Sequence, residues 1–451
     1  MSTLRCLWAP FLCAATLWAG FSESEKALKK ALAAKDATGV IAASEQLVAL
    51  GTPEAIKAVI RYGLACDNYK AEKAIAGKLA ALPLQLRTVV HEFARTIDHH
   101  QIRVILAAVL AAYDDPASFA ALGAMVKDPV PPVALEATRH LVNGSLATGD
   151  MRAIDALIEG LARHEKLEQS AVVAADIRQG LYALTGEELE SSAEWKKWWE
   201  PRRRTFKPAD AKSNQERPRR TVVRARSFFG HEIVSKRILF ILDMSGSMTK
   251  KDFPAGTGGG AGGEGEAKGR TVVKGKKKEK SPSEKEAEEK ELERKRENLP
   301  LDRQRLHRTQ VELKKTIESL TPDTRFTVMA FNHEIKLLSE SPQYAAPAFK
   351  RKAKDFVDGF KPEGETWTDT AVEKAFGLKD QIDTIYLLSD GAPQRKGKML
   401  PTDEIAQTVK EKNRFLKIKI YTVGFQQGGS KMHEFLGALA RDSGGTYKRL
   451  D

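Results

Sequence analysis

The sequence predicts an all-α, irregular helical-repeat domain followed by an α/β domain with a doubly wound, mostly parallel sheet. Two observations lead to this fold class. Apolar residues recur at helical spacing throughout residues 24–200, whereas from Phe228 onward short apolar runs alternate with amphipathic segments. Strands that alternate with helices imply a parallel sheet that is covered on both faces. The length of 451 residues also indicates more than one folded core.

Shifts in composition along the chain place the domain boundaries. We predict an export signal at 1–20, a helical domain at 21–200, a basic linker at 201–226, and an α/β domain at 227–451 with a low-complexity insertion at 249–298. The linker has few apolar residues and many charges, so it cannot bury enough surface to fold alone. The insertion has a glycine-rich part and a charged part, and we expect the charged part to form a solvated helix that continues into the next helix.

The first twenty residues have the features of an export signal. Arg5 supplies a positive charge, and the apolar run from Leu7 to Ala19 is shorter than the roughly 20 residues of a membrane span. Two of the three cysteines lie in this segment, so a mature chain would hold only Cys66 and no internal disulfide. This pattern favours export to the periplasm or cell envelope of a bacterium. The alternatives are an uncleaved signal, which would be the chain's only contact with a membrane, and a buried first helix.

The helical domain resembles HEAT-type repeats loosely. Helices of ten to fifteen residues alternate with short turns such as Asp114-Asp115-Pro116, and proline suits the first turn of a helix. No strict repeat is visible, so an irregular α-solenoid is expected. The tryptophan-rich segment Glu194–Trp199 is interpreted as a helix that caps the end of the core, with an aromatic ligand-binding cluster as the alternative.

In the α/β domain, unbroken apolar runs predict buried strands and amphipathic runs predict helices. The strands are expected at Ile238–Leu242, Phe326–Phe331, Thr384–Ser389 and Ile418–Phe425. The helices are expected at Gln304–Leu320, Ala371–Leu378, Asp403–Lys412 and His433–Ser443.

Oxygen-bearing side chains follow two of these strands. Asp243, Ser245 and Ser247 come directly after the first strand, and Asp390 comes directly after the third. A hydroxyl from the loop at residues 364–369, which precedes the second helix, would be a third contributor. Ligands of doubly wound sheets bind beyond the carboxyl ends of the strands, and hard cations such as Mg²⁺ prefer oxygen ligands. The oxygen-bearing side chains after the two strands, with a hydroxyl from this loop, are therefore candidate metal ligands.

This combination resembles the von Willebrand factor type A (VWA) family over about residues 226–451. Asp243, Ser245 and Ser247 match its metal-ion-dependent adhesion motif (MIDAS), and Thr366 and Asp390 match its distant threonine and aspartate. The resemblance implies one Mg²⁺, or Mn²⁺ or Ca²⁺, with the hydroxyls as direct ligands and the aspartates bound directly or through water. An acidic side chain of a protein partner would complete the shell. Two features depart from the pattern of the family. An insertion follows Met248, and Glu365 stands where the family often has glycine.

We therefore predict an exported binding module and not an enzyme. The sequence contains neither His-Glu-x-x-His nor Gly-x-Ser-x-Gly, and the glycines at 258–263 open no amphipathic helix. A net charge of +13, concentrated near 201–226 and 268–296, supports the alternative of a scaffold for an anionic polymer. No specific nucleic acid partner is expected. A metal-assisted hydrolase ranks last, because the sequence offers no clear general base.

Overall fold

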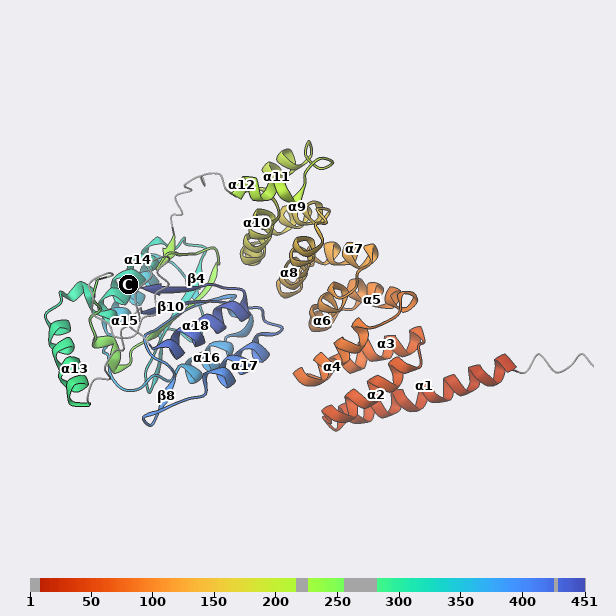
Figure 1. Ribbon diagram of the computed structural model, residues 1–451, viewed down its shortest axis with the longest axis horizontal. Helices are drawn as coiled ribbons and strands as arrows, with labels where there is room; N and C mark the ends of the chain where they lie inside the picture. Colours follow the sequence, from red (N-terminus) through yellow and green to blue (C-terminus); the bar gives the residue numbers. More distant parts are fainter. Residues whose placement is uncertain (1–8, 216–225, 255–281, 426–428, 451) are drawn as a thin grey trace, which may run out of the picture. The chain divides into compact units, whose positions relative to one another are not determined.

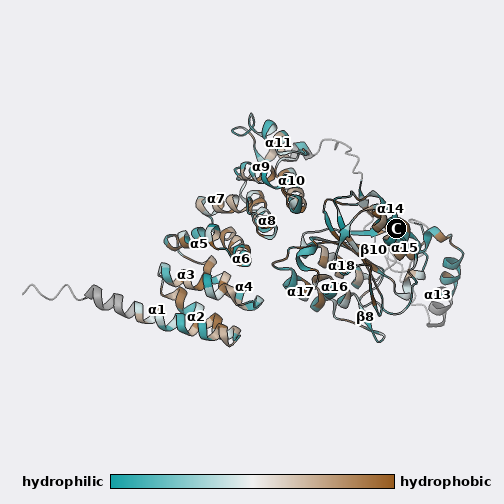
Figure 2. Cartoon of the chain, turned by 180° about the vertical axis from the view of Figure 1, so that it is seen from behind, coloured by the Kyte–Doolittle hydropathy of each residue, from teal (hydrophilic) through white to brown (hydrophobic). Residues whose placement is uncertain are grey.

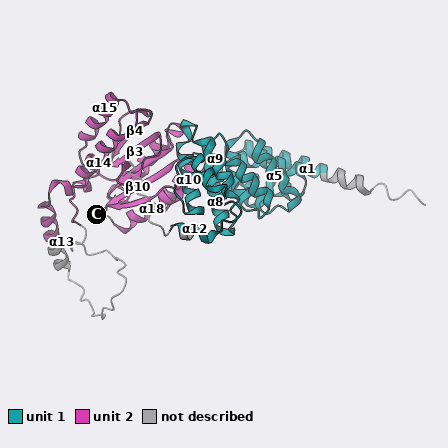
Figure 3. Cartoon of the chain, turned by 90° about the horizontal axis from the view of Figure 1, so that it is seen from above, with its two compact units in different colours: residues 1–222 teal, residues 223–451 magenta. Residues whose placement is uncertain are grey.

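The computed structural model describes residues 9–215, 226–254, 282–425 and 429–450 (Figure 1). The chain divides into two compact units, residues 1–222 and 223–451, which Figure 3 shows in different colours. The first unit is helical and the second contains the parallel sheet, as the sequence predicts.

Twelve α-helices make up the described part of the first unit. They are α1 (Ala9–Ala33), α2 (Ala37–Ala49), α3 (Pro53–Tyr62), α4 (Tyr69–Ala80), α5 (Leu84–Thr96), α6 (His100–Ala111), α7 (Pro116–Met125), α8 (Pro131–Thr148), α9 (Ala153–His164), α10 (Ala171–Thr185), α11 (Ser192–Trp199) and α12 (Pro208–Gln215). From α2 to α10 the even-numbered helices pack on one another in one layer, and the odd-numbered helices from α1 to α11 form a second layer. Whether these helices descend from a sequence repeat stays a prediction.

Local sequence signals start several of these helices. The side chains of Thr52, Asn68 and Asp115 each accept a hydrogen bond from a backbone N–H in the first turn of α3, α4 and α7. Proline occupies the first helical position of α3 and α7, where its missing N–H is no loss. These caps fix the short turns between the two layers.

The helical unit extends into the segment that was expected to be a linker from 201 onward. Helix α12 buries Ala211, and the Asn214 side chain donates a hydrogen bond to the carbonyl of Thr185 in α10. Because α12 buries only one alanine and is held by one side-chain amide, its sequence has no apolar pattern from which a helix could be predicted. Residues 216–225 of the predicted linker lie outside the described residues.

The predicted export signal overlaps the first helix. Helix α1 runs without a break from Ala9 to Ala33, so the predicted cleavage point falls inside it. Leu28 in its second half is buried, whereas Trp18 is 68% exposed. Among the described residues, no helix is both long and apolar enough to cross a membrane.

The second unit is built on a seven-stranded sheet with the order β11-β10-β7-β3-β4-β5, and β6 also pairs with β4. Strands β3, β4, β7, β10 and β11 are parallel, and β5 and β6 run antiparallel to β4. The strands of the unit are β1 (Ser227–Phe228), β2 (His231–Glu232), β3 (Arg237–Asp243), β4 (Arg325–Phe331), β5 (Ile335–Leu337), β6 (Gln343–Tyr344), β7 (Thr384–Ser389), β8 (Gln394–Arg395), β9 (Lys398–Met399), β10 (Lys419–Phe425) and β11 (Tyr447–Leu450).

Helices cover both faces of this sheet, as expected for a doubly wound fold. The α-helices of the unit are α13 (Pro282–Glu297), α14 (Arg305–Ser319), α15 (Pro347–Asp358), α16 (Thr368–Phe376), α17 (Thr402–Asn413) and α18 (Ser430–Ser443), and those from α14 to α18 form the covering layers. One core contains α14, α15 and the side chain of Phe240, and the other contains α16, α17, α18 and the side chain of Ile241. Alternate residues of β3 thus enter opposite cores.

Helix α13 does not belong to these layers. It projects from the unit in all three views (Figures 1, 2 and 3), and the part of it that is coloured in Figure 2 is mostly hydrophilic. It ends at Glu297, and a 3-10 turn at Leu301–Arg303 separates it from α14. The expected continuous helix is therefore interrupted, with Pro300 preceding the turn.

The ends of the insertion are part of the fold. Asp252 is completely buried, and its N–H donates to the carbonyl of Arg303. The side chain of Lys251 donates to the carbonyls of Glu297 and Leu299. Residues 250–254 and 297–304, called the neck below, therefore hold the two ends of the insertion together. Residues 255–281 lie outside the described part of the chain.

Candidate metal centre

Asp243 is the last residue of β3, between β4 and β7 at the carboxyl end of the parallel sheet. Its side chain is completely buried. Oδ1 accepts a hydrogen bond from the N–H of Ser245 at 2.7 Å, and Oδ2 accepts one from the hydroxyl of Ser389. Burial and the nearby Asp390 carboxylate raise the pKa of Asp243 to about 7. The fold thus holds a carboxylate where its negative charge is poorly solvated.

Ser245, Ser247 and Asp390 continue from Asp243 as a chain of hydrogen bonds. The two serine hydroxyls lie 3.0 Å apart, and the hydroxyl of Ser247 donates to Oδ1 of Asp390 at 2.6 Å. Asp390 follows β7, the neighbour of β3, and only 4% of it is exposed. Adjacent strands therefore bring these residues together although 143 positions separate Ser247 from Asp390.

Thr366 reaches the same place from the loop before α16. A Cβ atom on Gly391 would lie 3.2 Å from the Thr366 hydroxyl, so Thr366 packs directly beside Gly391, the residue that follows Asp390. The loop is joined to the first motif through the carbonyl of Gly364, which accepts a hydrogen bond from the N–H of Gly246 at 3.0 Å. Gly364 has a φ of +74° and lies against His333, so only glycine fits there. The structure thus gathers all five predicted residues.

The donor set suits a hard divalent cation. It contains two carboxylates and three hydroxyls, and oxygen is the ligand atom that Mg²⁺ and Ca²⁺ prefer. The described residues contain no group of three or more His, Cys, Asp or Glu side chains that could hold a metal. A cation here would therefore depend on hydroxyl ligands. The raised pKa of Asp243 favours this fit, because a cation beside both aspartates would offset the burial cost and their mutual repulsion.

Three further residues belong to the centre and were not predicted from the sequence. Ser389 orients Asp243, as described above. Arg305, the first residue of α14, donates from Nη1 to Oδ2 of Asp390 at 2.8 Å and from Nη2 to Asp252 at 2.7 Å. Asp252 and Arg305 are 53 positions apart, across the insertion, so no local spacing links them. The only sequence signal is an acid and a base at the two ends of the inserted segment.

Glu365, the departure from the family pattern, has a defined structural role. Its carboxylate accepts hydrogen bonds from the N–H groups of Lys396 and Gly397, at 2.8 and 2.6 Å, and from the indole of Trp367 at 3.2 Å. These hydrogen bonds lower the pKa of Glu365, and the bond from the N–H of Gly397 contributes most. Lys396 and Gly397 both have positive φ and form the turn between β8 and β9. Glu365 thus fastens this hairpin beside Thr366.

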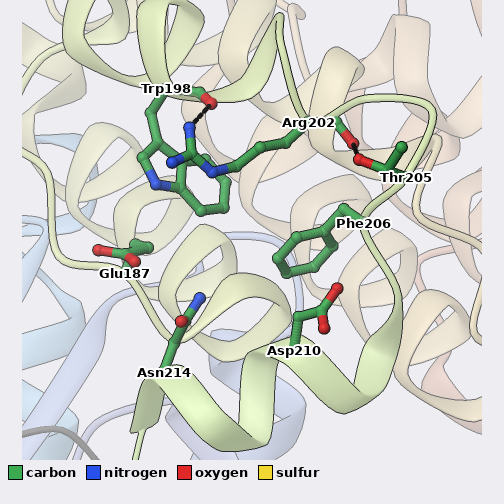
Figure 4. Close-up of a pocket in the computed structure, with 7 residues that line it drawn as sticks. All are labelled: Glu187, Trp198, Arg202, Thr205, Phe206, Asp210 and Asn214. Atoms are coloured by element: carbon green, nitrogen blue, oxygen red, sulfur yellow. Dashed lines mark hydrogen bonds between the residues drawn. The ribbon is translucent and has the colours of Figure 1, made fainter.

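The helical unit has a separate cavity of about 260 Å³ near its C-terminal end (Figure 4). Trp198, Arg202 and Phe206 are among the residues that line it, and the guanidinium of Arg202 lies 4.9 Å from the Trp198 ring centre. The other two tryptophans of α11, Trp195 and Trp199, are buried. Their burial agrees with the expected capping helix.

Comparisons with known proteins agree with this fold. A family model for the von Willebrand factor type A domain matches residues 302–449. The match begins after the insertion and so does not include β3. Strand β3 belongs to the same sheet, because it pairs in parallel with β4 and β7, which both lie inside the match. The C-terminal unit is thus an α/β domain with a doubly wound sheet and with oxygen donors at the carboxyl end of that sheet. The C-terminal half of this chain contains a von Willebrand factor type A domain.

The chain is also similar, at low identity, to a Synechocystis protein and to solved structures that include the following two. An uncharacterized protein of Synechocystis is 27% identical over 158 residues, which is 34% of this chain and 35% of that protein. The chain therefore matches about a third of the length of that relative. A von Willebrand factor type A structure from Catenulispora acidiphila is 14% identical, with a TM-score of 0.32 over 49% of this chain and 39% of that one. Proximal thread matrix protein 1 from the mussel byssus, with a zinc-occupied MIDAS motif, is 15% identical, with a TM-score of 0.28 over 47% of this chain and 40% of that one.

Proposed function

We propose that the C-terminal unit binds one divalent cation, Mg²⁺ or alternatively Mn²⁺ or Ca²⁺, and through it an acidic side chain of a protein partner. The observation that carries the proposal is the buried Asp243 carboxylate, which accepts the N–H of Ser245 at the carboxyl end of the sheet. From Ser245, the hydroxyls of Ser245 and Ser247 continue the chain of hydrogen bonds to Asp390. Asp243, Ser245, Ser247, Thr366 and Asp390 would hold the cation. The neutral hydroxyl ligands would leave it electrophilic, so a partner carboxylate would bind to it favourably.

The hairpin beside the site supports an acidic partner. Lys396 and Lys398 are exposed on it, and Glu365 holds it next to Thr366. Positive charges around a binding site attract and orient a negatively charged partner. VWA domains usually act as binding modules without catalysis, and we propose the same role for this chain.

Calorimetry with Mg²⁺ on the full chain tests the cation site. We expect a single site in the wild type and its loss in Asp243→Ala. The matched control is Asp323→Ala, which removes a half-buried aspartate, paired with Lys236, before β4 at the opposite end of the sheet. Binding that survives in Asp243→Ala, or that disappears equally in the control, contradicts the proposed ligands.

The protein partner requires a second experiment. The wild-type chain and Asp243→Ala are used as baits, each with Mg²⁺ and with EDTA. The proposal expects proteins that the wild type retains only with Mg²⁺ and that the variant does not retain. Identical retention under all four conditions contradicts cation-dependent binding.

Binding of an anionic polymer is the second candidate function. Arg152, Arg203 and Arg204 line one pocket at the end of the helical unit, although Arg203 is paired with Asp155 and Arg152 with Asp150. Polymer binding through such residues would weaken steeply with added salt and would not respond to EDTA. A salt titration with heparin as the probe separates this function from the first.

We also propose that the protein is exported to a bacterial envelope and that residues 1–20 are removed. The support is the charged and apolar pattern of this segment. N-terminal sequencing of the protein from an envelope fraction tests it. A first residue at Met1, or recovery in the cytoplasmic fraction alone, contradicts the proposal.

A further inference from the structure

A buried chain of charges connects the candidate metal centre to the neck of the insertion. The guanidinium of Arg305 lies between two aspartates, with Nη1 on Asp390 and with Nε and Nη2 on Asp252. Only 3% of the Arg305 side chain is exposed, and both carboxylates are buried. Removing one member of such a group leaves a buried charge without its partner, which is strongly unfavourable. The three side chains are therefore constrained to move together.

This arrangement determines how Asp390 faces the site. Its Oδ2 is committed to Arg305 at 2.8 Å, and its Oδ1 accepts the hydroxyl hydrogen of Ser247 at 2.6 Å. A rotation of the carboxylate would break both bonds. Arg305 therefore keeps Oδ1 directed toward the serine hydroxyls. Residues that orient metal ligands in this way commonly affect metal affinity strongly.

The same arginine is linked to the neck through Asp252. The Asp252 carbonyl accepts a hydrogen bond from Nε of Arg303 at 2.8 Å, and its N–H donates to the Arg303 carbonyl at 3.0 Å. The N–H of Arg305 itself donates to the carbonyl of Lys250 at 3.0 Å. A displacement of the neck would thus move Asp252 and withdraw one of the two partners of Arg305.

We propose that Arg305 is a positioning residue of the cation site and that, through Asp252, it links cation binding to the conformation of the neck. This inference rests on the proposed cation site. Without Asp252, the positive charge of Arg305 is balanced by Asp390 alone, so Arg305 competes with the cation for that carboxylate. Linkage is reciprocal, so a bound cation also stabilises the neck.

Calorimetry with Mg²⁺ on the full chain compares wild type, Asp252→Asn and Asp302→Asn. Asp302 is an exposed aspartate in the neck, so its variant makes the same change of charge without touching Arg305. We expect Asp252→Asn to weaken Mg²⁺ binding by about ten-fold, the lower end for residues that orient metal ligands, and Asp302→Asn to leave it unchanged. Arg305→Lys retains the charge but not the fork of donors, and should also weaken binding.

Hydrogen exchange supplies a readout that does not depend on affinity. Saturating Mg²⁺ should slow exchange of the amides of Asp252 and Arg305 in the wild type, and should do so much less in Arg305→Lys. If Asp252→Asn does not fold, Arg305→Lys decides the question. A wild-type chain that binds no Mg²⁺ overturns the proposed function together with this inference. Binding that is equal in all variants, or weakened equally by Asp302→Asn, overturns this inference alone.

Discussion

At the scale of single residues, Asp243 predicts a pH-dependent stability. Its folded-state pKa of about 7 lies above the ordinary 3.8, so between these values the folded chain holds a proton that the unfolded chain has released. Without a cation, its contribution to the free energy of unfolding should therefore fall as pH rises from about 4 to 7, by on the order of a few kcal/mol. Mg²⁺ binds the ionised carboxylate, so its stabilising effect should be larger at pH 8 than at pH 5.

Asp243→Asn isolates this effect from the other titrating groups. Scanning calorimetry of both chains across this pH range, with EDTA, gives the difference in stability at each pH. The stability of the variant relative to the wild type should increase as pH rises, because the amide of its Asn side chain has no charge to bury. The variant should also lose the response to Mg²⁺. A difference that is constant from pH 4 to 8 contradicts this role of Asp243.

Glu365 leads to a second prediction at this scale. Glu365→Ala removes the acceptor for two N–H groups of the β8–β9 turn, so the hairpin should detach more often from the loop of Thr366. Trypsin should then cleave faster after Lys396 and Lys398, with little change in the thermal midpoint. The control is Glu363→Ala, because Glu363 bonds to the carbonyl of Met244 through its backbone N–H, which this variant retains. Equal cleavage rates in the two variants would contradict the anchoring role.

The five candidate ligands could be found from the sequence because their signals are local. Each lies directly after an apolar strand or within one polar loop, and strand order brings the loops together. Arg305 and Asp252 could not be found in this way, because their pairing depends on how the chain returns after the insertion. Their burial is visible only once β3, α14 and the neck are packed.

At the scale of elements, buried strands were easier to predict than edge strands. The predicted boundaries of Thr384–Ser389 coincide with β7, which is buried along its whole length and lies between two strands. Strand β11 was not predicted. It has four partly exposed residues and exists because it pairs with β10 at the edge of the sheet. Such strands are defined by the strands with which they pair, and a local sequence pattern does not show these partners.

The insertion leads to a matched pair of deletions. Replacing residues 255–295 by a short Gly-Ser link should leave the fold intact, because the neck already holds the two ends together. Replacing 249–298 also removes Asp252 and leaves Arg305 with only one buried partner. We expect that deletion to cost about 3–5 kcal/mol more.

Thermal unfolding of the two deletion variants beside the wild type measures this difference. Loss of Mg²⁺ binding in the longer deletion alone would agree with the role proposed for Asp252. If the two variants melt at the same temperature, the neck contributes nothing to the fold. If the shorter deletion is unfolded, residues 255–295 themselves are required.

At the scale of the whole molecule, the two units have different kinds of core. The helical unit buries side chains between two layers of helices, and its end is closed by Trp195 and Trp199. The second unit buries its strands between helices on both faces. Since each unit has its own core, each is expected to fold alone.

The helical unit should therefore fold as an isolated fragment, and its stability should depend on where the fragment ends. Residues 21–215 include Phe206, which packs edge-on against Trp199 with ring centres 5.7 Å apart, and α12 with its buried Ala211. A fragment of residues 21–200 lacks both. We expect each fragment to show a helical circular dichroism spectrum and a cooperative melt. The longer one should be more stable by about 1–2 kcal/mol, the value of partly burying an aromatic side chain.

Urea titrations followed by circular dichroism measure this difference. Equal midpoints would place residues 201–215 outside the folded unit, and a fragment 21–215 that does not melt cooperatively would contradict its independence from the second unit.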